Sequence, residues 1–242
     1  MRTHVSKTVS NCFAALRQIR SIRHYVSRQV MLSMVVPLVL QRLDFGNATL
    51  VGIPAYQLNR LQSVLNAAAR LVLSRSKNDH VTPLLQKLHW LRIEQRIEFK
   101  LSVLVFLCLN GRAPPYLSRD LLRVSDLAAR QHLRSSSSST LVVPPTRLST
   151  AGDRAFPVPA VRSRNSLSIS LTSLSSLASF RRHLKTELFI RSFPDLDSSA
   201  YDRIWQLLCS HFASLSRFVN VLAFVRCPCS LLTLRHLNLF FL

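Results

Sequence analysis

Apolar residues recur at helical spacing over most of the chain before residue 194, which predicts a series of amphipathic helices. The first stripe comprises Val5, Val9, Cys12, Phe13, Leu16 and Ile19. A second apolar segment spans residues 30–43. We expect Pro37 to kink or break that segment, because proline has no N–H and its ring clashes with the preceding turn.

Pro54 opens the clearest helical pattern of the chain. The apolar face predicted for this helix comprises Leu58, Leu61, Leu65, Ala68, Ala69 and Val72. The run of small residues at 67–69 allows another helix to approach closely.

Two further helices are predicted between residues 82 and 111. Thr82 is expected to be the N-cap of the first, with Pro83 at the first helical position. The second has a stripe made of Ile93, Ile97, Leu101, Leu104, Val105 and Cys108. Gly111 is expected to end it, since glycine adopts the left-handed conformation that closes many helices.

The pattern changes after residue 128. Following the short helix predicted for "APPYLSRDLLR", the run "SSSSST" has low complexity, and "TLVVPPTR" indicates a short extended strand stopped by prolines. The segment "GDRAFPVPAV" is expected either to pair with that strand or to form a loop. Helix is predicted to return at about Ser176, with a face made of Leu177, Phe180, Leu184 and Leu188.

These patterns predict a mainly α fold, a helical bundle or thumb-like array with a short irregular or β-containing insertion. The predicted regions are a helical thumb-like region at 1–128, a Ser/Pro-rich linker with room for short strands at 129–160, a C-terminal helix region at 161–193, and a poorly patterned, poorly ordered tail at 194–242.

The composition is strongly basic. The formal net charge is +21, and 27 of the 32 basic residues are arginine. A chain this basic repels itself unless it meets polyanions, and arginine suits bidentate phosphate contacts. Nucleic acid, as RNA, DNA or their hybrid, is therefore the expected partner.

Catalytic and metal-binding patterns are missing from the sequence. It has no glycine-rich phosphate loop, no His-Glu-x-x-His and no Gly-x-Ser-x-Gly. Asp195 and Asp197 form a close acidic pair, but they lie in a Pro- and Ser-flanked linker. Cys227 and Cys229 have no second pair of ligands at zinc spacing. We therefore expect no catalytic residue, no metal, no cofactor and no small-molecule substrate.

The corner at 77–80 joins two predicted helices. Asp79 and His80 could act as an acid–base pair or contact phosphate, but as sequence neighbours before a helix start they are expected mainly to organise the turn. Trp90 and Phe99 could stack on bases. Trp90 lies beside an apolar stripe, so core packing is the favoured interpretation for it.

The N-terminus does not resemble a signal peptide, because polar residues interrupt its first positions. The apolar run "MLSMVVPLVL" is too short to span a bilayer. Arg217, Arg226 and Arg235 interrupt the apolar tail. Together these features predict a nuclear or cytoplasmic protein without a membrane span.

Seven segments occur here in an order that resembles the region after the polymerase core in reverse transcriptases of Jockey-like non-LTR (LINE-type) retrotransposons. They are "SNCFAALRQIRSIR", "RLDFGNATLVGIPAYQLNRLQSVLNAAARLV", "DHVTPLLQKLHWLRIEQRIEFKLSVL", "GRAPPYLS", "LRSSSSSTLVVPPTR", "GDRAF" and "SFRRHLKTELF". The resemblance covers roughly residues 3–193, and it is the ordered set that makes it specific.

The resemblance implies a thumb-like helical region that grips template RNA, target DNA or their hybrid during target-primed reverse transcription. The endonuclease and the metal-binding palm of an RNA-directed DNA polymerase would lie upstream, so no catalytic residue carries over. The sequence also departs from the family pattern. Gly46 stands where Cys is usual, Arg164 where Trp is usual, and Ser168 where Pro is usual.

Phosphate contacts are expected at basic residues that lie off the apolar stripes. Three triplets meet this criterion: Arg17, Arg20 and Arg23 on the first helix; Arg70, Arg75 and Lys77 at the corner; and Arg181, Arg182 and Lys185 on the last helix. The leading hypothesis is a truncated reverse-transcriptase fragment that binds nucleic acid without sequence choice. The alternatives are an inert translated remnant and a host helical interaction or membrane-associated protein. The oligomeric state is not fixed by the sequence.

Overall fold

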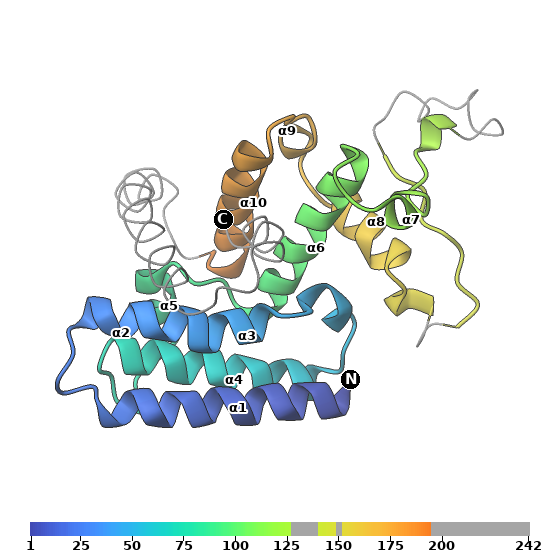
Figure 1. Ribbon diagram of the computed structural model, residues 1–242. Coiled ribbons are helices and arrows are strands. Elements are labelled where there is room, and N and C mark those ends of the chain that lie inside the picture. Colours follow the sequence, from blue (N-terminus) through green and yellow to red (C-terminus); the bar gives the residue numbers. More distant parts are fainter. Residues whose placement is uncertain (127–139, 149–151, 195–242) are drawn as a thin grey trace, which may run out of the picture. The chain divides into compact units, whose positions relative to one another are not determined.

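A computed structural model describes residues 1–126, 140–148 and 152–194 (Figure 1). The chain divides into two compact units, Met1–Pro194 and Asp195–Leu242, and every residue of the second unit lies outside the described part. The first unit is mainly helical, as the sequence predicted, and its described residues contain no strand. The predictions for the serine run, for Asp195 and Asp197, for Cys227 and Cys229 and for the tail concern residues outside the described part of the chain.

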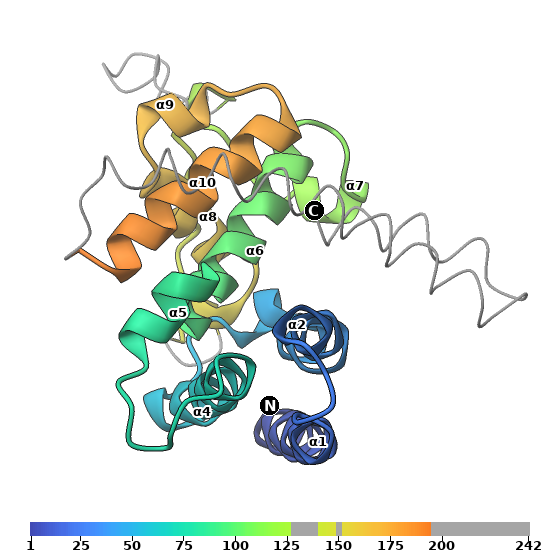
Figure 2. The ribbon, with the colours of Figure 1, turned by 90° about the vertical axis from the view of Figure 1, so that its left-hand side faces the viewer.

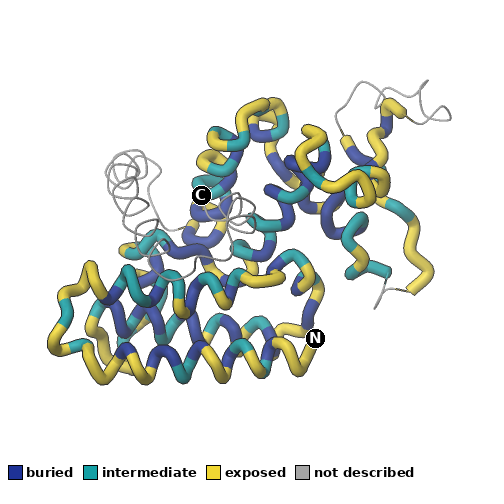
Figure 3. The backbone as a smooth tube through the Cα atoms, viewed as in Figure 1, coloured by how far each residue is buried: buried dark blue, intermediate teal, exposed yellow. Residues whose placement is uncertain are grey.

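The N-terminal half of this unit is built from helices that pack side by side (Figure 1). They are α1 (Arg2–Ser21), α2 (Arg28–Val35), α3 (Gln41–Asp44) and α4 (Ala55–Val72). The predicted stripe of α1 is buried from Val5 to Ile19, except that Ala15 replaces Phe13 at its centre. In α4, Ala68 and Ala69 are fully buried, so the small residues lie inside the bundle as expected. Figure 3 shows the buried sides facing inward and the exposed sides facing solvent.

Pro37 neither breaks the second segment nor leaves it a regular helix. A π-helical turn, η1 (Val36–Leu40), carries the chain from α2 into α3. The Gln41 N–H donates to the Val36 carbonyl, five residues back. Proline cannot supply its own N–H to the ladder, and a π turn is a common way for a helix to absorb such a local mismatch.

The second half of this unit contains α6 (Ile93–Leu109), which packs against α4, α7, α8 and α10, and further helices. They are α5 (Thr82–Leu88), α7 (Pro115–Ser118), α8 (Pro157–Asn165), α9 (Ile169–Thr172) and α10 (Leu177–Ser192), with 3₁₀ turns at Asn47–Leu50, Val124–Asp126 and Gly152–Arg154. Because α6 has neighbours on several sides, the burial of its last three turns is not limited to one stripe. Most residues of those turns are buried.

The predicted stop at Gly111 is confirmed in detail. Gly111 has a φ of +64°, in the left-handed region. Its N–H donates to the Cys108 carbonyl, and the Arg112 N–H donates to the Leu107 carbonyl at 2.9 Å. This pair of bonds is the Schellman motif, which satisfies carbonyls left open at the end of α6.

The expectation for 141–160 was wrong in two respects. The segment "TLVVPPTR" contributes only an isolated antiparallel bridge, between Arg123 and Leu141, instead of a strand. The segment "GDRAFPVPAV" is mostly helical, because α8 begins at Pro157 and not near Ser176. Pro157 and Pro159 occupy the first turn of α8, where backbone N–H groups have no intrahelical acceptor and proline is tolerated.

The Arg164 side chain lies inside the fold with 9% exposure. Its Nη2 donates to the Thr172 carbonyl at 3.2 Å. Burial lowers the pKa of the Arg164 guanidinium, and the charge of Arg123 lowers it further. Among the described residues, no carboxylate forms an ion pair with Arg164. A buried charge without a counter-charge destabilises the folded state.

Replacing Arg164 with an apolar side chain of similar length should therefore stabilise the protein. We expect Arg164→Met to raise the free energy of unfolding by about 1–4 kcal/mol, the range seen when buried charges are replaced by apolar groups. Urea denaturation of the full chain measures the change. The matched control is Arg162→Met on the same helix, whose 57% exposed side chain should give a change within about 1 kcal/mol. A clear loss of stability in Arg164→Met would contradict the interpretation.

Candidate nucleic-acid interface

Three chain segments converge at one end of the bundle formed by α1, α2 and α4. The Arg60 guanidinium donates to the Ser6 hydroxyl at 3.0 Å, which places the first half of α4 beside the first turns of α1. Since α1 and α4 then pack along one another in the same direction, their C-terminal ends lie together. The N-terminus of α2 joins them, because only a short connection follows α1. We call this region, residues 17–28 and 70–80, the basic end (Figure 2).

The triplet at the end of α1 is partly available for contacts. Arg17 and Arg20 are exposed on the last turns of α1. Arg23 lies beyond the helix, which ends at Ser21, so its placement on the first helix was wrong. Its Nε donates to Nε2 of His24 at 3.1 Å. Arg20 lies in the last turn of α1, where the partial negative charge of the helix C-terminus stabilises a cation.

The corner after α4 is organised by Asp79, as predicted. The Asp79 carboxylate accepts from the Ser76 N–H at 3.2 Å, and the Asp79 N–H donates to the Ser76 carbonyl. This reciprocal pair closes the turn and occupies the Asp79 carboxylate. Thr82 is not the N-cap that was predicted; Val81 holds that position and Thr82 is the first helical residue.

Arg70 has a structural role that the sequence did not reveal. Its Nη2 donates to the Asp79 carbonyl at 3.2 Å, and its Nε is buried. The side chain therefore ties the end of α4 to the corner. Spacing places Arg70 off the apolar face, but it cannot show that the chain folds back over this side chain.

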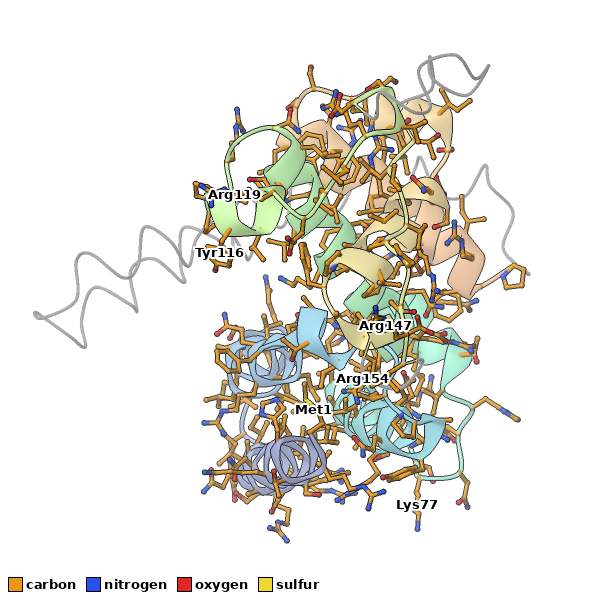
Figure 4. All side chains as sticks on the ribbon, turned by 90° about the vertical axis from the view of Figure 1, so that its right-hand side faces the viewer. Met1, Lys77, Tyr116, Arg119, Arg147 and Arg154 are labelled. Carbon is orange, nitrogen blue, oxygen red and sulfur yellow. The ribbon has the colours of Figure 1, made fainter. Side chains whose placement is uncertain are left out.

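Arg75 and Lys77 are exposed at the tip of the corner. In Figure 4 the Lys77 side chain points away from the body of the protein. Among the described residues, neither forms an ion pair. Both can therefore reach an anion without breaking an internal contact.

A cavity of about 150 Å³ opens beside the corner. Its lining includes four polar residues and three apolar ones: Arg28, Ser74, Arg75 and Lys87, with Val72, Leu73 and Leu84. Within residues 1–126, 140–148 and 152–194, no carboxylate lines it. Arg28 and Lys87 were not among the predicted site residues. Each is the one basic residue of its helix, and only the packing of α2, α4 and α5 brings both to the cavity.

The third predicted triplet lies on α10, which packs against α6, and it is not a solvent-facing group. Arg182 is exposed, whereas Arg181 and Lys185 are half-buried. Burial lowers the pKa of the Arg181 guanidinium. The charge of Lys185 adds to burial in lowering the pKa of His89, which places Lys185 close to the end of α5. All three cations lie off the buried face of α10, but only Arg182 is fully exposed.

Carboxylates neutralise several cations elsewhere in this unit. Asp44 accepts two hydrogen bonds from Arg96, at 2.6 and 2.8 Å, and joins α3 to α6. Arg191 of α10 pairs with Glu98 and Glu187. By contrast, Arg28, Arg75 and Lys87 have no acidic partner among the described residues. The electrostatic potential around the cavity is consequently positive, because carboxylates of the described residues do not neutralise these cations.

The two aromatic residues proposed as base-stacking candidates are not exposed platforms. Trp90 has 7% exposure, which confirms core packing, and Phe99 is half-buried. Within the described residues, no group of three or more His, Cys, Asp or Glu side chains could hold a metal ion. The same part of the chain contains no helix with the length and apolar character needed to cross a membrane.

No protein-family model, curated protein or solved structure matches this chain.

At the corner, Arg70 has a structural role and Arg75 is a surface residue. We expect Arg70→Ala to lower the free energy of unfolding by about 1–2 kcal/mol, because it removes a charged hydrogen bond to a backbone carbonyl. Arg75→Ala should change it by less than about 0.5 kcal/mol, as for an ordinary surface substitution. Parallel urea titrations compare the two. Equal losses in both variants would show that the tie between Arg70 and the corner does not stabilise the fold.

Proposed function

We propose that this chain is a helical nucleic-acid-binding module of the kind that follows the polymerase core in non-LTR retrotransposon reverse transcriptases. Two supports are independent of each other. One is the ordered set of segments in the sequence that resembles that region. The other, which carries the proposal, is the basic end, where two of the three predicted basic triplets and an open cationic cavity come together.

The contacts at the basic end are phosphate contacts. Arginine and lysine side chains without carboxylate partners attract phosphates at long range and release counter-ions on binding. Such contacts supply affinity and register but do not read base sequence. The module therefore binds RNA, DNA or their hybrid without sequence preference.

The cations most directly available are Arg17, Arg20, Arg75 and Lys77, together with Arg28 and Lys87 at the cavity. Arg182 lies apart from them on α10. Arg70 acts indirectly, because it holds the corner in place. Cations that already hold an internal contact, such as Arg70, are less available to a phosphate than exposed cations without one.

The test is binding of the purified full chain to a labelled RNA–DNA hybrid across a salt series. Logarithmic plots of affinity against salt should be linear, with a slope of about −0.9 for each phosphate contact. The double variant Arg75→Ala with Lys77→Ala should make the slope shallower by about 2 and weaken binding roughly tenfold or more at moderate salt.

The matched control is Arg112→Ala with Arg119→Ala, which also removes two exposed cations. Arg119 lies on the opposite side from Lys77 in Figure 4. The control should bind with nearly the parental slope. Equal weakening in both double variants would show that only net charge matters and would refute the basic end as the interface. Absence of saturable binding would favour the inert remnant.

A further inference from the structure

One exposed aromatic ring lies at the basic end. Tyr25 is 88% exposed in the connection between α1 and α2. Its N–H donates to the Ile22 carbonyl at 3.0 Å, so the backbone at this position is held in a turn. A ring with that exposure adds almost nothing to the core. It does offer a flat apolar face to a ligand.

Tyr25 lies close to the cationic cavity. Arg28, which lines the cavity, follows Tyr25 by three positions, and three residue steps span at most about 11 Å. The Ser27 hydroxyl accepts from the Val30 N–H at 3.4 Å and caps α2, which fixes where Arg28 begins the helix. One short segment therefore carries both Tyr25 and the cavity residue Arg28.

The size and lining of the cavity determine what it can hold. At about 150 Å³ it is well below the roughly 300 Å³ at which pockets begin to enclose whole small molecules. Arg28, Arg75 and Lys87 all line it, and no carboxylate is among its described lining residues. This combination suits one phosphate group, with Val72, Leu73 and Leu84 as the apolar part of the lining.

We propose that the basic end binds an unpaired strand of RNA or DNA, with one backbone phosphate in the cavity and an adjacent base stacked on Tyr25. The proposal rests on the proposed function and narrows it to single-stranded nucleic acid. Bases within a duplex are stacked on one another and cannot present a face to a side chain. A cationic groove with an aromatic platform is how proteins bind single strands without reading sequence.

A membrane surface is the competing ligand, since Ile22 and Val30 are also partly exposed nearby. The observations favour nucleic acid. The apolar face of α1 is buried in the bundle, so that helix has no free amphipathic face to insert into lipid. The cavity is concave and lined by three cations, which matches a single phosphate better than a flat headgroup layer.

The experiment compares the full chain with Tyr25→Ala, Tyr25→Phe and Tyr116→Ala on two probes of equal length, a labelled unstructured oligothymidine and a labelled DNA duplex. Tyr116 is a matched control, since it is 68% exposed on α7 (Figure 4). We expect Tyr25→Ala to weaken binding to the single strand about 5- to 100-fold, the effect of losing one base stack. Duplex binding should stay unchanged, Tyr25→Phe should bind like the parent, and Tyr116→Ala should have no effect.

Two further measurements test the cavity. Oligothymidine with and without a 5′-terminal phosphate should bind equally if the cavity takes a backbone phosphodiester; a clear gain with the terminal phosphate contradicts that assignment. Millimolar inorganic phosphate should raise the melting temperature of the parent more than that of Arg28→Ala. Equal stabilisation of the two proteins would contradict the cavity as the phosphate site.

The outcomes separate this proposal from the one on which it rests. If the Arg75→Ala, Lys77→Ala double variant weakens both probes while Tyr25→Ala weakens neither, the nucleic-acid function stands and the single-strand proposal fails. If the parent chain binds neither probe, both fail. Stronger binding to anionic phosphatidylserine vesicles than to oligothymidine, lost in Tyr25→Ala, would overturn the single-strand proposal in favour of a membrane surface.

Discussion

The close packing of α1 against α4 is the constraint on which the rest of the structure depends. Ala68 and Ala69 are fully buried in α4, and small buried side chains allow neighbouring helices to approach closely. The hydrogen bond between Arg60 and Ser6 marks the parallel direction of the pair. Because both helices end on the same side, the basic residues that follow each apolar stripe are brought together. Without that packing, the cations near residues 17–28 and 70–80 would belong to separate surfaces.

The charges of this unit follow two different arrangements. Around α6, carboxylates pair with arginines across helices, as Asp44 does with Arg96 and Glu98 with Arg191, and these pairs join elements distant in sequence. At the cavity, the lining residues that the structure describes include three cations and no carboxylate. Like charges held together repel, which destabilises the free protein slightly and is relieved when an anion binds. The second arrangement is typical of a binding surface, and the first of a scaffold.

Sequence periodicity predicts the helices well where one face is buried, as in α1 and α4, and glycine chemistry predicts the end of α6 at Gly111. It fails at α8, because Pro157 and Pro159 suggest a loop although prolines are acceptable in a first helical turn. It also ranks site residues poorly. Arg70 and Arg75 look equivalent in sequence, and only the folded corner shows that one holds a carbonyl and the other faces solvent. The cavity could not be predicted, since Arg28 and Lys87 meet Arg75 only through tertiary packing.

The most direct test of the central claim is hydrogen–deuterium exchange on the full chain with and without a saturating oligothymidine. Backbone amides of an interface exchange more slowly when a ligand orders them and excludes water. The account predicts slower exchange at residues 20–30 and 72–80, and unchanged exchange along α10. Protection confined to α10, or no protection in residues 1–194 under saturating conditions, would contradict the basic end as the nucleic-acid interface.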